Sequence, residues 1–548
     1  MTFLENILAE LASAPESAFL QEIFPDITSS ATGKEILELI AKARTFLSQK
    51  GLNKGDRCAL LAGNSIRWIA MDLAIMAEGL IAVPLYSRQA AIELVAMMKD
   101  CSPSLICCGD QTLRDGILEN WVEAPPQFLF DEIFATSAVA PSKPRLADSD
   151  PVAIIYTSGT SGEAKGVVLN AGNVTFMLGA TSARLDLLME GHSGQDRVYH
   201  YLPLCFAGAW ISLLTCLLRR SLVTMNTDLT RLAGEMRAAA PDYFLNVPAL
   251  LERMRKAVDE QLWKTGGLVL TIYRRAKTAW MNQQEGKSGF SDRIWLSLGR
   301  AAVFPTIRRK MIGSNLKALI CGSAPLNSET QLYFMMLGIP VLQVYGLTET
   351  TAICTLDDPR QVVAGRVGPA IAGIEMKLGD NDEIIIRGPN IFPGYWNRPE
   401  ETAKALQEGW FHTGDQGELD AAGNWRIIGR IKNLIILGSG HNIGPEPIED
   451  EILQQLPSAQ QVVLLGNGRG YLSAIVTGTV TRDQVQTAMD AVNPGLPHYK
   501  QIRAFHVEAE PFSIDNGLLT ANGKLKRDAI VARFKDQIEA MYRVKQAS

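Results

Sequence analysis

The chain has little of what marks a metal-bound or disulfide-linked protein. Its 548 residues include 8 cysteines and 6 histidines. The cysteines form no C-x-x-C pair and none follows Cys354, and the histidines have no ligand-like spacing. Disulfide frameworks and structural zinc sites depend on such spacings. We therefore expect buried, reduced cysteines and no structural zinc site.

Strong net charge and long apolar runs are also missing. The formal net charge is −5 and 20% of residues are charged, which fits a soluble globular protein and gives no reason to expect a nucleic-acid partner. The most apolar stretch, 66–85, contains Arg67, Asp72 and Glu78, so we expect no membrane-spanning helix. The N-terminus is acidic and does not resemble a secretory signal. We expect a cytoplasmic protein whose contact with a membrane is at most peripheral.

Short aliphatic runs alternate with helical patterns through the first 350 residues. The runs are apolar continuously rather than alternately, which is typical of strands buried on both faces of a parallel sheet. Beyond Arg430 the pattern restarts in smaller units, enough for a second domain. We expect an α/β fold, with a large N-terminal domain (1–430) of several subdomains with mostly parallel sheets and a small α+β C-terminal domain (431–548). The runs occupy 57–63, 79–86, 104–108, 152–157, 316–322 and 340–346, and the clearest helical patterns 35–49 and 90–99.

A loop rich in hydroxyls and glycine follows the run that ends at Tyr156. Backbone N–H groups and hydroxyls in such a loop can surround phosphate oxygens, and Lys165 adds a positive charge. The spacing of a Walker A loop is absent here and elsewhere in the chain. The candidate phosphate-binding residues are Thr157, Ser158, Gly159, Thr160, Ser161, Gly162 and Lys165.

Five further motifs follow in order along the chain. A turn after the run at 316–322 reads Gly322-Ser323-Ala324-Pro325, and the run at 340–346 continues as Val344-Tyr345-Gly346-Leu347-Thr348-Glu349-Thr350. Then come 409–415, which ends in Asp415, with Ile428-Gly429-Arg430-Ile431-Lys432 after it, and the loop 519–527 around Lys524. With the loop after Tyr156, these motifs resemble those of the adenylate-forming superfamily, which includes acyl-CoA synthetases, luciferases and peptide-synthetase adenylation domains. The resemblance covers nearly the whole chain. Two positions depart from the family pattern: Ala164 stands for its usual proline and Ala171 for its usual histidine.

The resemblance implies a role for each motif. Tyr345 would stack on adenine, Thr348 would contact the α-phosphate, and Glu349 would coordinate Mg²⁺, which suits a carboxylate beside phosphate oxygens. Asp415 would accept from the ribose hydroxyls and Arg430 would hold the nucleotide. The implied nucleotide-binding set is the phosphate loop together with Gly322, Ser323, Ala324, Pro325, Val344, Tyr345, Gly346, Thr348, Asp415, Ile428, Arg430 and Lys524.

The resemblance also implies a two-step reaction with ATP, Mg²⁺ and CoA. An acid attacks the α-phosphorus of ATP to give an acyl-adenylate, and a thiol then takes the acyl group. Catalysis would rest on positioning and charge stabilisation. The implied catalytic residues are Lys524, Thr157, Lys165 and Glu349.

Lys524 would reach the site from a mobile C-terminal domain that pivots at Lys432. We interpret its neighbours Lys526 and Arg527 as surface charges. Gly440 would let a pantetheine chain pass close to the backbone, although the glycines around it could serve only a turn.

The acid is a weaker inference than the reaction. Phe206 and Trp210 follow the family's substrate-side motif and suit an apolar acyl wall, or they belong to the ordinary core. A turn at 246–248, followed by a basic insertion, and the string 445–449 resemble long-chain acyl-CoA synthetases. We therefore expect activation of a medium- or long-chain fatty acid and its transfer to CoA.

Two alternatives remain open. One is transfer to the pantetheine of a carrier protein. The other is a degenerate, non-catalytic acyl- or nucleotide-binding protein, against which the intact Lys165, Glu349, Asp415, Arg430 and Lys524 argue.

The segment 251–317 differs from its surroundings. Residues 252–317 hold 14 basic and 5 acidic side chains, a net charge of +9 inside a chain of −5. The segment also carries Trp263, Tyr273, Trp280 and Trp295. We predict a helical insertion with a polar break at 283–289. It attaches the protein reversibly to anionic membranes, or it covers the core with a basic face that is solvated or that attracts CoA phosphates.

Overall fold

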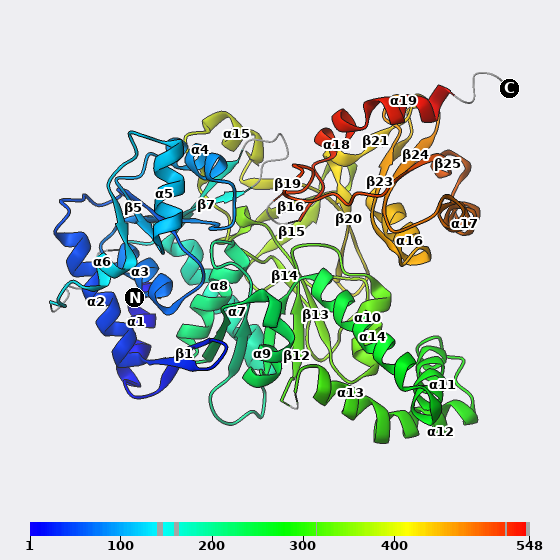
Figure 1. The fold of residues 1–548 in the computed structure, drawn as a ribbon, viewed down its shortest axis with the longest axis horizontal. Helices are drawn as coiled ribbons and strands as arrows, with labels where there is room; N and C mark the ends of the chain where they lie inside the picture. The colour runs from blue at the N-terminus through cyan, green and yellow to red at the C-terminus, as the bar shows by residue number, and fades with distance from the viewer. Residues whose placement is uncertain (140–145, 158–163, 314, 521–522, 544–548) are drawn as a thin grey trace.

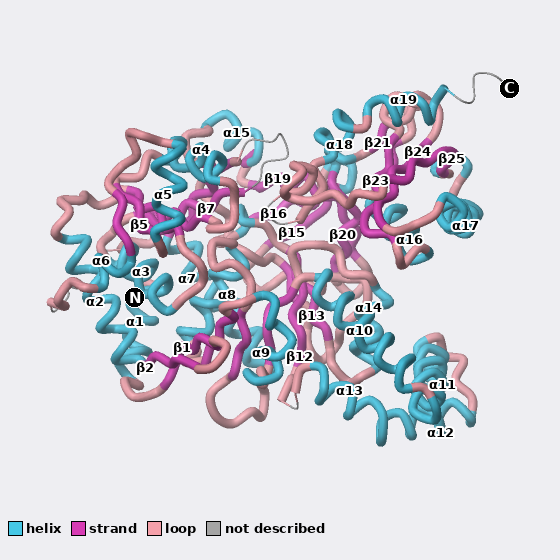
Figure 2. The backbone as a smooth tube through the Cα atoms, viewed as in Figure 1, coloured by secondary structure: helices cyan, strands magenta, loops and turns pink. Residues whose placement is uncertain are grey.

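The structure is a computed structural model that describes residues 1–139, 146–157, 164–313, 315–520 and 523–543. Figure 1 shows a large body made by the chain up to Arg430, with a smaller C-terminal unit in orange and red beside it. In Figure 2 the strands run through the interior of the body and the helices lie around them. The predicted α/β class with a separate C-terminal domain is confirmed.

The first sheet forms one half of the body. Its strand order is β14-β13-β12-β11-β9-β10-β1-β2, and neighbours from β13 to β1 run parallel, whereas both edge strands run antiparallel. The strands are β1 (Ala18–Ile23), β2 (Thr28–Thr32), β9 (Arg197–His200), β10 (Leu222–Asn226), β11 (Tyr243–Asn246), β12 (Ala318–Cys321), β13 (Val341–Tyr345) and β14 (Thr355–Leu356).

A second sheet has a similar parallel centre. Its order is β17-β8-β7-β4-β3-β5-β6, with parallel pairs from β7 to β6. The six aliphatic runs of the sequence all form strands of these two sheets. The strands of the second are β3 (Arg57–Leu61), β4 (Ile81–Leu85), β5 (Leu105–Cys108), β6 (Gln127–Leu129), β7 (Pro151–Thr157), β8 (Lys165–Asn170) and β17 (Gly394–Tyr395).

A third sheet departs from the expected parallel pattern. It is antiparallel, in the order β15-β16-β19-β18, with β20 paired to β19. The expectation of mostly parallel sheets holds for the two larger sheets, and this third sheet is an antiparallel exception. Its pairs β15–β16, β18–β19 and β19–β20 each follow one another closely in the chain, which suits antiparallel pairing. The strands are β15 (Glu375–Leu378), β16 (Glu383–Arg387), β18 (Leu406–Gln407), β19 (Trp410–Leu419) and β20 (Trp425–Arg430).

Helices cover the parallel sheets and bury their apolar sides. In α3, from Ile66 to Ala77, every residue except Arg67 is buried, including Asp72. The remaining helices of the body outside 248–311 are α1 (Phe3–Ser13), α2 (Gly33–Ser48), α4 (Ala91–Cys101), α5 (Gln111–Asn120), α6 (Phe130–Phe134), α7 (Ala171–Leu188), α8 (Ala207–Leu218), α9 (Leu232–Ala239), α14 (Ser328–Met336) and α15 (Pro399–Ala405). The eight cysteines are all buried.

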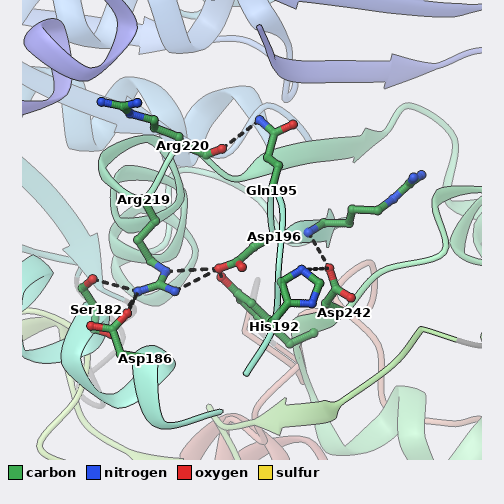
Figure 3. Close-up of polar contacts among 10 residues, drawn as sticks. Ser182, Asp186, His192, Gln195, Asp196, Arg219, Arg220 and Asp242 are labelled. Carbon is green, nitrogen blue, oxygen red and sulfur yellow. Dashed lines mark hydrogen bonds and ion pairs between the residues drawn. The ribbon is translucent and has the colours of Figure 1, made fainter. Parts of the chain in front are cut away.

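A polar network ties together the amino ends of the first sheet (Figure 3). Asp196 precedes β9 and accepts hydrogen bonds from Arg219 (Nη2 at 3.0 Å) and from Tyr243 (Oη at 3.2 Å). Asp242 precedes β11 and accepts from the backbone N–H of Arg197 at 2.8 Å. The side-chain network therefore stabilises the sheet at the amino ends of its parallel strands. In open α/β sheets, ligands bind at the opposite, carboxyl ends of the strands.

The segment 251–317 is helical, as predicted, although its first helix begins at Pro248. A turn at Gly266, which the sequence did not predict, separates α10 from α11, and the predicted polar break falls between α11 and α12. The Nζ of Lys256 on α10 donates to the backbone oxygen of Pro457 at 3.2 Å and so contacts the C-terminal unit. The helices are α10 (Pro248–Thr265), α11 (Gly267–Gln284), α12 (Phe290–Leu298), the π-helix η2 (Gly299–Val303) and α13 (Phe304–Met311).

The C-terminal unit has its own apolar clusters, made of residues from Ile435 onward. Its central sheet has the order β23-β24-β25, and a β21–β22 hairpin precedes it. No helix in the described part of the chain is long and apolar enough to cross a membrane. The elements are β21 (Ile435–Ile436), β22 (Asn442–Ile443), β23 (Ala459–Leu465), β24 (Leu472–Gly478), β25 (Ile502–Glu508), α16 (Glu446–Gln455), α17 (Arg482–Val492), α18 (Arg527–Arg533) and α19 (Lys535–Arg543).

Candidate active site

The candidate site begins at the carboxyl end of β13. The chain leaves Tyr345 through Gly346 and forms a short 3-10 turn, η3 (Thr348–Thr350), that carries Glu349. A Cβ built on Gly346 would lie 2.0 Å from the carbonyl oxygen of Ala352, so only glycine fits this turn. The turn therefore fixes where Thr348 and Glu349 stand relative to the sheet.

Asp415 joins two elements of the site. Its Oδ2 accepts a hydrogen bond of 2.8 Å from the hydroxyl of Tyr345, and its Oδ1 lies 2.6 Å from Nε of Arg430. Asp415 and Arg430 face each other across the β19–β20 pair. Burial raises the pKa of Asp415, whereas the charge of Arg430 and the Tyr345 hydrogen bond lower it. The side chains of β13, β19 and β20 thus meet around one buried carboxylate.

Glu349 is held by a residue that the sequence analysis did not single out. The hydroxyl of Tyr395, on β17, donates to Oε1 of Glu349 at 2.9 Å. The ammonium of Lys165 lies 5.3 Å from the centre of the Tyr395 ring, a cation–π distance. Tyr395 therefore links the predicted metal ligand to the lysine that follows the phosphate loop.

Lys524 comes to this place from the C-terminal unit. Its loop is closed by a hydrogen bond from the backbone N–H of Thr520 to the carbonyl of Lys524, at 2.8 Å, and Gly523 has a φ of +73°. The Lys524 side chain is exposed to solvent, although protein atoms surround part of it. Burial and the charge of Arg430 lower its pKa, and Asp415 and Glu349 raise it. Lys524 is thus near both carboxylates of the site.

The remaining nucleotide-binding candidates come from strands of all three sheets of the body. Ser323, Ala324 and Pro325 are exposed after β12, and Ser323 has a φ of +72°. A Cβ on Gly322 would lie 2.4 Å from Cγ2 of Val344, so these two predicted residues are in contact. Thr157 ends β7 and Ile428 lies on β20. Ser158, Gly159, Thr160, Ser161 and Gly162 lie outside the described residues.

The two acyl-wall candidates have different surroundings. Phe206 is half-buried at the start of α8 and packs on Tyr86, with ring centres 5.6 Å apart. Trp210 is fully buried, and its indole N–H donates to Oδ2 of Asp72 at 2.8 Å. Phe206 is partly accessible, whereas Trp210 has the environment of a core residue, the alternative left open above.

Gly440 and Lys432 lie near the start of the C-terminal unit. Gly440 stands in the turn between β21 and β22 with a φ of +83° and no heavy atom within 4 Å of a Cβ built on it. Lys432 is in the short turn η5 (Ile431–Asn433), where burial and the neighbouring Arg430 lower its pKa to about 8. The positive φ is consistent with a role of Gly440 in the turn. The open space around it is also compatible with the predicted passage of a pantetheine chain.

The interpretation of Arg527 as a surface charge was wrong. Its guanidinium forms two hydrogen bonds to the buried carboxylate of Glu449, at 2.8 and 2.5 Å. The pair connects α16 to the start of α18, close to the Lys524 loop. The sequence suggested solvent exposure for Arg527 because its partner, Glu449, lies 78 residues away along the chain. Nothing in the local sequence indicates that pairing.

Comparison with known proteins identifies a family for the chain. The model of the AMP-binding enzyme family matches residues 11–396, and that of the AMP-binding enzyme C-terminal domain matches 432–546. The long-chain-fatty-acid–CoA ligase FadD15 of Mycobacterium bovis is 25% identical and covers 96% of this chain and 95% of its own. The long-chain-fatty-acid–CoA ligase ACSBG1 of Bos taurus is 26% identical, over 92% of this chain and 80% of its own.

Solved structures share the fold. ATP-bound MatB from Rhodopseudomonas palustris has a TM-score of 0.74 at 23% identity, covering 98% of this chain and 99% of its own. The O-succinylbenzoate coenzyme A synthetase MenE of Bacillus subtilis with AMP has a TM-score of 0.75 at 21% identity, over 95% and 97%. Two family models that together span most of the chain, and a site assembled from both units, place this protein in the AMP-binding enzyme family.

Proposed function

We propose that the protein uses ATP to activate a medium- or long-chain fatty acid as an acyl-adenylate and then transfers the acyl group to CoA, releasing AMP and pyrophosphate. The observation that supports this proposal is the position of Lys524, close enough to Glu349, Asp415 and Arg430 for their charges to shift its pKa. A cation supplied by a second structural unit suits a reaction in which two anions, the carboxylate and the α-phosphate, must be brought together.

The chain's own residues divide the work of the first step. Asp415, oriented by Tyr345 and Arg430, accepts hydrogen bonds from the ribose hydroxyls of the nucleotide. Lys524 stabilises charge on the substrate carboxylate and the phosphate. Thr157, Lys165 and the phosphate loop offset the charge of the departing pyrophosphate.

Glu349 fits a Mg²⁺ ligand. It is a partly accessible carboxylate with one oxygen held by Tyr395, a neutral donor, and a carboxylate beside phosphate oxygens is an ordinary magnesium environment. When bound, Mg²⁺ supplies positive charge to the phosphate oxygens. Tyr395 orients the carboxylate.

In the second step, the thiol of CoA has to reach the acyl carbonyl at the place that Lys524 occupies in the first step. We propose that the C-terminal unit pivots near Lys432, which withdraws Lys524 and brings the Gly440 turn to the body. The space beside Gly440 admits the pantetheine chain. Transfer to a carrier-protein pantetheine differs only in the acceptor.

The acyl chain is assigned with the help of the relatives' names, which are those of long-chain-fatty-acid–CoA ligases. Phe206, packed on Tyr86, is the proposed apolar wall of the acyl site, and Trp210 supports it from the core. These groups carry no charge, which favours an aliphatic acid over an amino acid.

A panel of straight-chain acids from acetate to stearate tests the proposal. Pyrophosphate release is measured for each acid with ATP and Mg²⁺, first without an acceptor and then with CoA or with a pantetheinylated carrier protein. We expect the highest kcat/KM for the longer acids, and acyl-CoA as product. No pyrophosphate release with any acid would contradict the proposal, and thioester formed only on the carrier protein would change the acceptor.

A further inference from the structure

Large apolar side chains are exposed at several positions of the helical insertion. Of the twenty large apolar side chains exposed among the described residues, six lie between 263 and 298. Single exposed apolar residues are normal on a protein surface, but a concentration of them marks a site of interaction. We call this group the insertion face: Trp263, Leu268, Val269, Phe290, Ile294 and Leu298.

An apolar stripe runs along the exposed side of α12, beside the exposed Ser291, Arg293 and Ser297. Phe290, Ile294 and Leu298 are 80%, 48% and 43% exposed, and residues four apart lie on the same side of a helix. The opposite side of α12 packs inward through Leu296, which is 6% exposed. A helix on the surface of a globular protein normally has a polar outward side. The apolar stripe on the exposed side of α12 therefore indicates a surface that binds another molecule.

Basic side chains accompany the insertion face. Arg293 and Arg300 are exposed on α12 and η2. The guanidinium of Arg274 lies 5.4 Å from the centre of the exposed Trp263 ring. With the net charge of +9 over 252–317, these groups favour a partner that is anionic as well as apolar.

The insertion face is remote from the candidate active site. In Figure 1, α11 and α12 lie at the lower right of the molecule, beyond α10 and α14 and away from the region where β13, β19 and β20 meet. Figure 2 shows the same helices as a group that projects from the body. A large flat partner could contact these helices without covering the active site.

We propose that the insertion face binds peripherally to an anionic lipid bilayer, with Phe290, Ile294 and Leu298 entering the headgroup–acyl boundary and Arg293 and Arg300 contacting lipid phosphates. A bilayer offers apolar and anionic groups together, which a helix with an apolar side and basic flanks needs. A second copy docked symmetrically would bring one basic surface against another. Nucleic acid would pair with the arginines but would leave the apolar side chains without a partner.

The membrane would also give access to the proposed substrate, because long-chain acids partition into bilayers. This link rests on the proposed function. The binding itself does not, since it needs neither ATP nor an acid, and the two ideas can therefore fail separately.

Vesicle co-sedimentation of the full-length protein tests the binding. Vesicles of phosphatidylcholine alone are compared with vesicles that also contain phosphatidylglycerol, at low and high salt, without nucleotide or acid. We expect binding to the anionic vesicles that weakens as salt increases. Phe290→Ser with Ile294→Ser should weaken this binding about tenfold at either salt concentration, because the apolar contact is lost. Arg293→Glu with Arg300→Glu should weaken it mainly at low salt.

Matched controls carry the same kinds of change elsewhere on the surface. Val122→Ser removes a side chain that is 89% exposed, and Lys404→Glu with Lys535→Glu reverses two exposed charges. Both should bind vesicles like the wild type. Every substituted residue is exposed, so folding should be retained, and pyrophosphate release with a water-soluble acid should be unchanged.

Three results would overturn the proposal. Anionic vesicles fail to bind the wild-type protein, both pairs of insertion variants bind like their controls, or light scattering without lipid shows a dimer that the Phe290 and Ile294 changes dissociate. The last result would make the insertion face a contact between two copies.

Discussion

Tyr345 donates its phenolic hydrogen to Asp415 across 2.8 Å and so joins the end of β13 to the middle of β19. Arg430 holds the other oxygen of the same carboxylate from β20. One carboxylate oxygen of Asp415 therefore contacts a neutral hydrogen-bond donor, and the other contacts a cation. This arrangement orients the carboxylate that we assign to the nucleotide ribose.

Loss of the Tyr345 hydroxyl should weaken nucleotide binding. A hydrogen bond to a buried carboxylate contributes about 1.5–3 kcal/mol, so Tyr345→Phe should raise the KM for ATP roughly tenfold or more and leave the KM for the acid nearly unchanged. Steady-state kinetics of pyrophosphate release measure both constants. Tyr499→Phe, at an exposed tyrosine, is the control. An unchanged KM for ATP in a folded Tyr345→Phe variant would argue against the assigned role of Asp415.

Lys524→Ala should separate the two half-reactions. Adenylation should fall by about two orders of magnitude or more, because the cation that stabilises the carboxylate and phosphate is removed. Thioester formation from a preformed acyl-adenylate should be largely kept. Single-turnover assays measure each step, and Lys526→Ala, two residues along the chain, is the control. Equal loss in both steps would show that Lys524 acts in folding or in domain placement.

Tyr395→Phe should act through the metal. The variant keeps the ring that lies beside Lys165 but removes the donor to Glu349, so the carboxylate loses its fixed orientation. We expect the Mg²⁺ concentration for half-maximal activity to rise roughly fivefold, with a smaller effect at saturating Mg²⁺. Initial rates over a Mg²⁺ titration test this, with Tyr499→Phe again as control. A fall in rate that Mg²⁺ does not restore would place Tyr395 outside the metal site.

Arg527→Ala should destabilise the C-terminal unit. The change leaves the carboxylate of Glu449 buried without its cation, which costs about 3–5 kcal/mol. Burial already raises the pKa of Glu449, and Arg527 lowers it. Chemical unfolding should show an earlier transition for Arg527→Ala, and Glu449→Gln with Arg527→Gln should recover part of the loss. If Arg527→Ala unfolds like Lys526→Ala, the pair contributes little to stability.

Asp72 gives the N-terminal body a dependence on pH. Burial raises the pKa of Asp72 to about 7, although the Trp210 hydrogen bond lowers it. The folded state therefore binds the proton more tightly than the unfolded state. The stabilisation is fully present below the unfolded pKa and is lost as the pH rises through the folded pKa. At about 1.4 kcal/mol per unit of pKa, the loss between acidic and alkaline pH is on the order of 4 kcal/mol.

Asp72→Asn tests this relationship. Its carbonyl oxygen still accepts from Trp210, but the side chain no longer ionises, so the free energy of unfolding should fall less between pH 5 and pH 8 than in the wild type. Denaturant unfolding at the two pH values measures the difference. Asp26→Asn, at an exposed carboxylate, should keep the wild-type dependence. The same slope in Asp72→Asn and wild type would show that Asp72 does not titrate in this range.

The parallel sheets could be predicted from the sequence because their strands are apolar on both faces. The antiparallel sheet could not. Along β19 the inward positions are Phe411, Thr413, Asp415 and Gly417, and three of these four side chains are polar or absent. The alternation of apolar and polar residues that would indicate a half-buried strand is therefore missing from the sequence of β19. At Asp415 the strand buries the carboxylate that we assign to the nucleotide, where an aliphatic side chain would have indicated a strand.

The site was predictable where its residues belong to compact motifs. Glu349 and Lys524 each lie in a string of neighbours that resembles the family. Tyr395 and Arg527 act through partners 46 and 78 residues away, and nothing in the local sequence indicates those pairings. Trp210 lies in a motif, but its full burial and its bond to Asp72 depend on α3, which packs against it from another part of the chain.

The hydrogen bond from Lys256 to Pro457 has a consequence for how the protein changes shape. It is an exposed hydrogen bond between α10 and the C-terminal unit, and such a bond contributes about 0.5–1.5 kcal/mol. A ligand that binds one arrangement of the two units tenfold more tightly than another shifts their balance by about 1.4 kcal/mol. Differences in affinity for the successive reactants are therefore large enough to outweigh this contact, and the populations of the two arrangements can follow which reactant is bound.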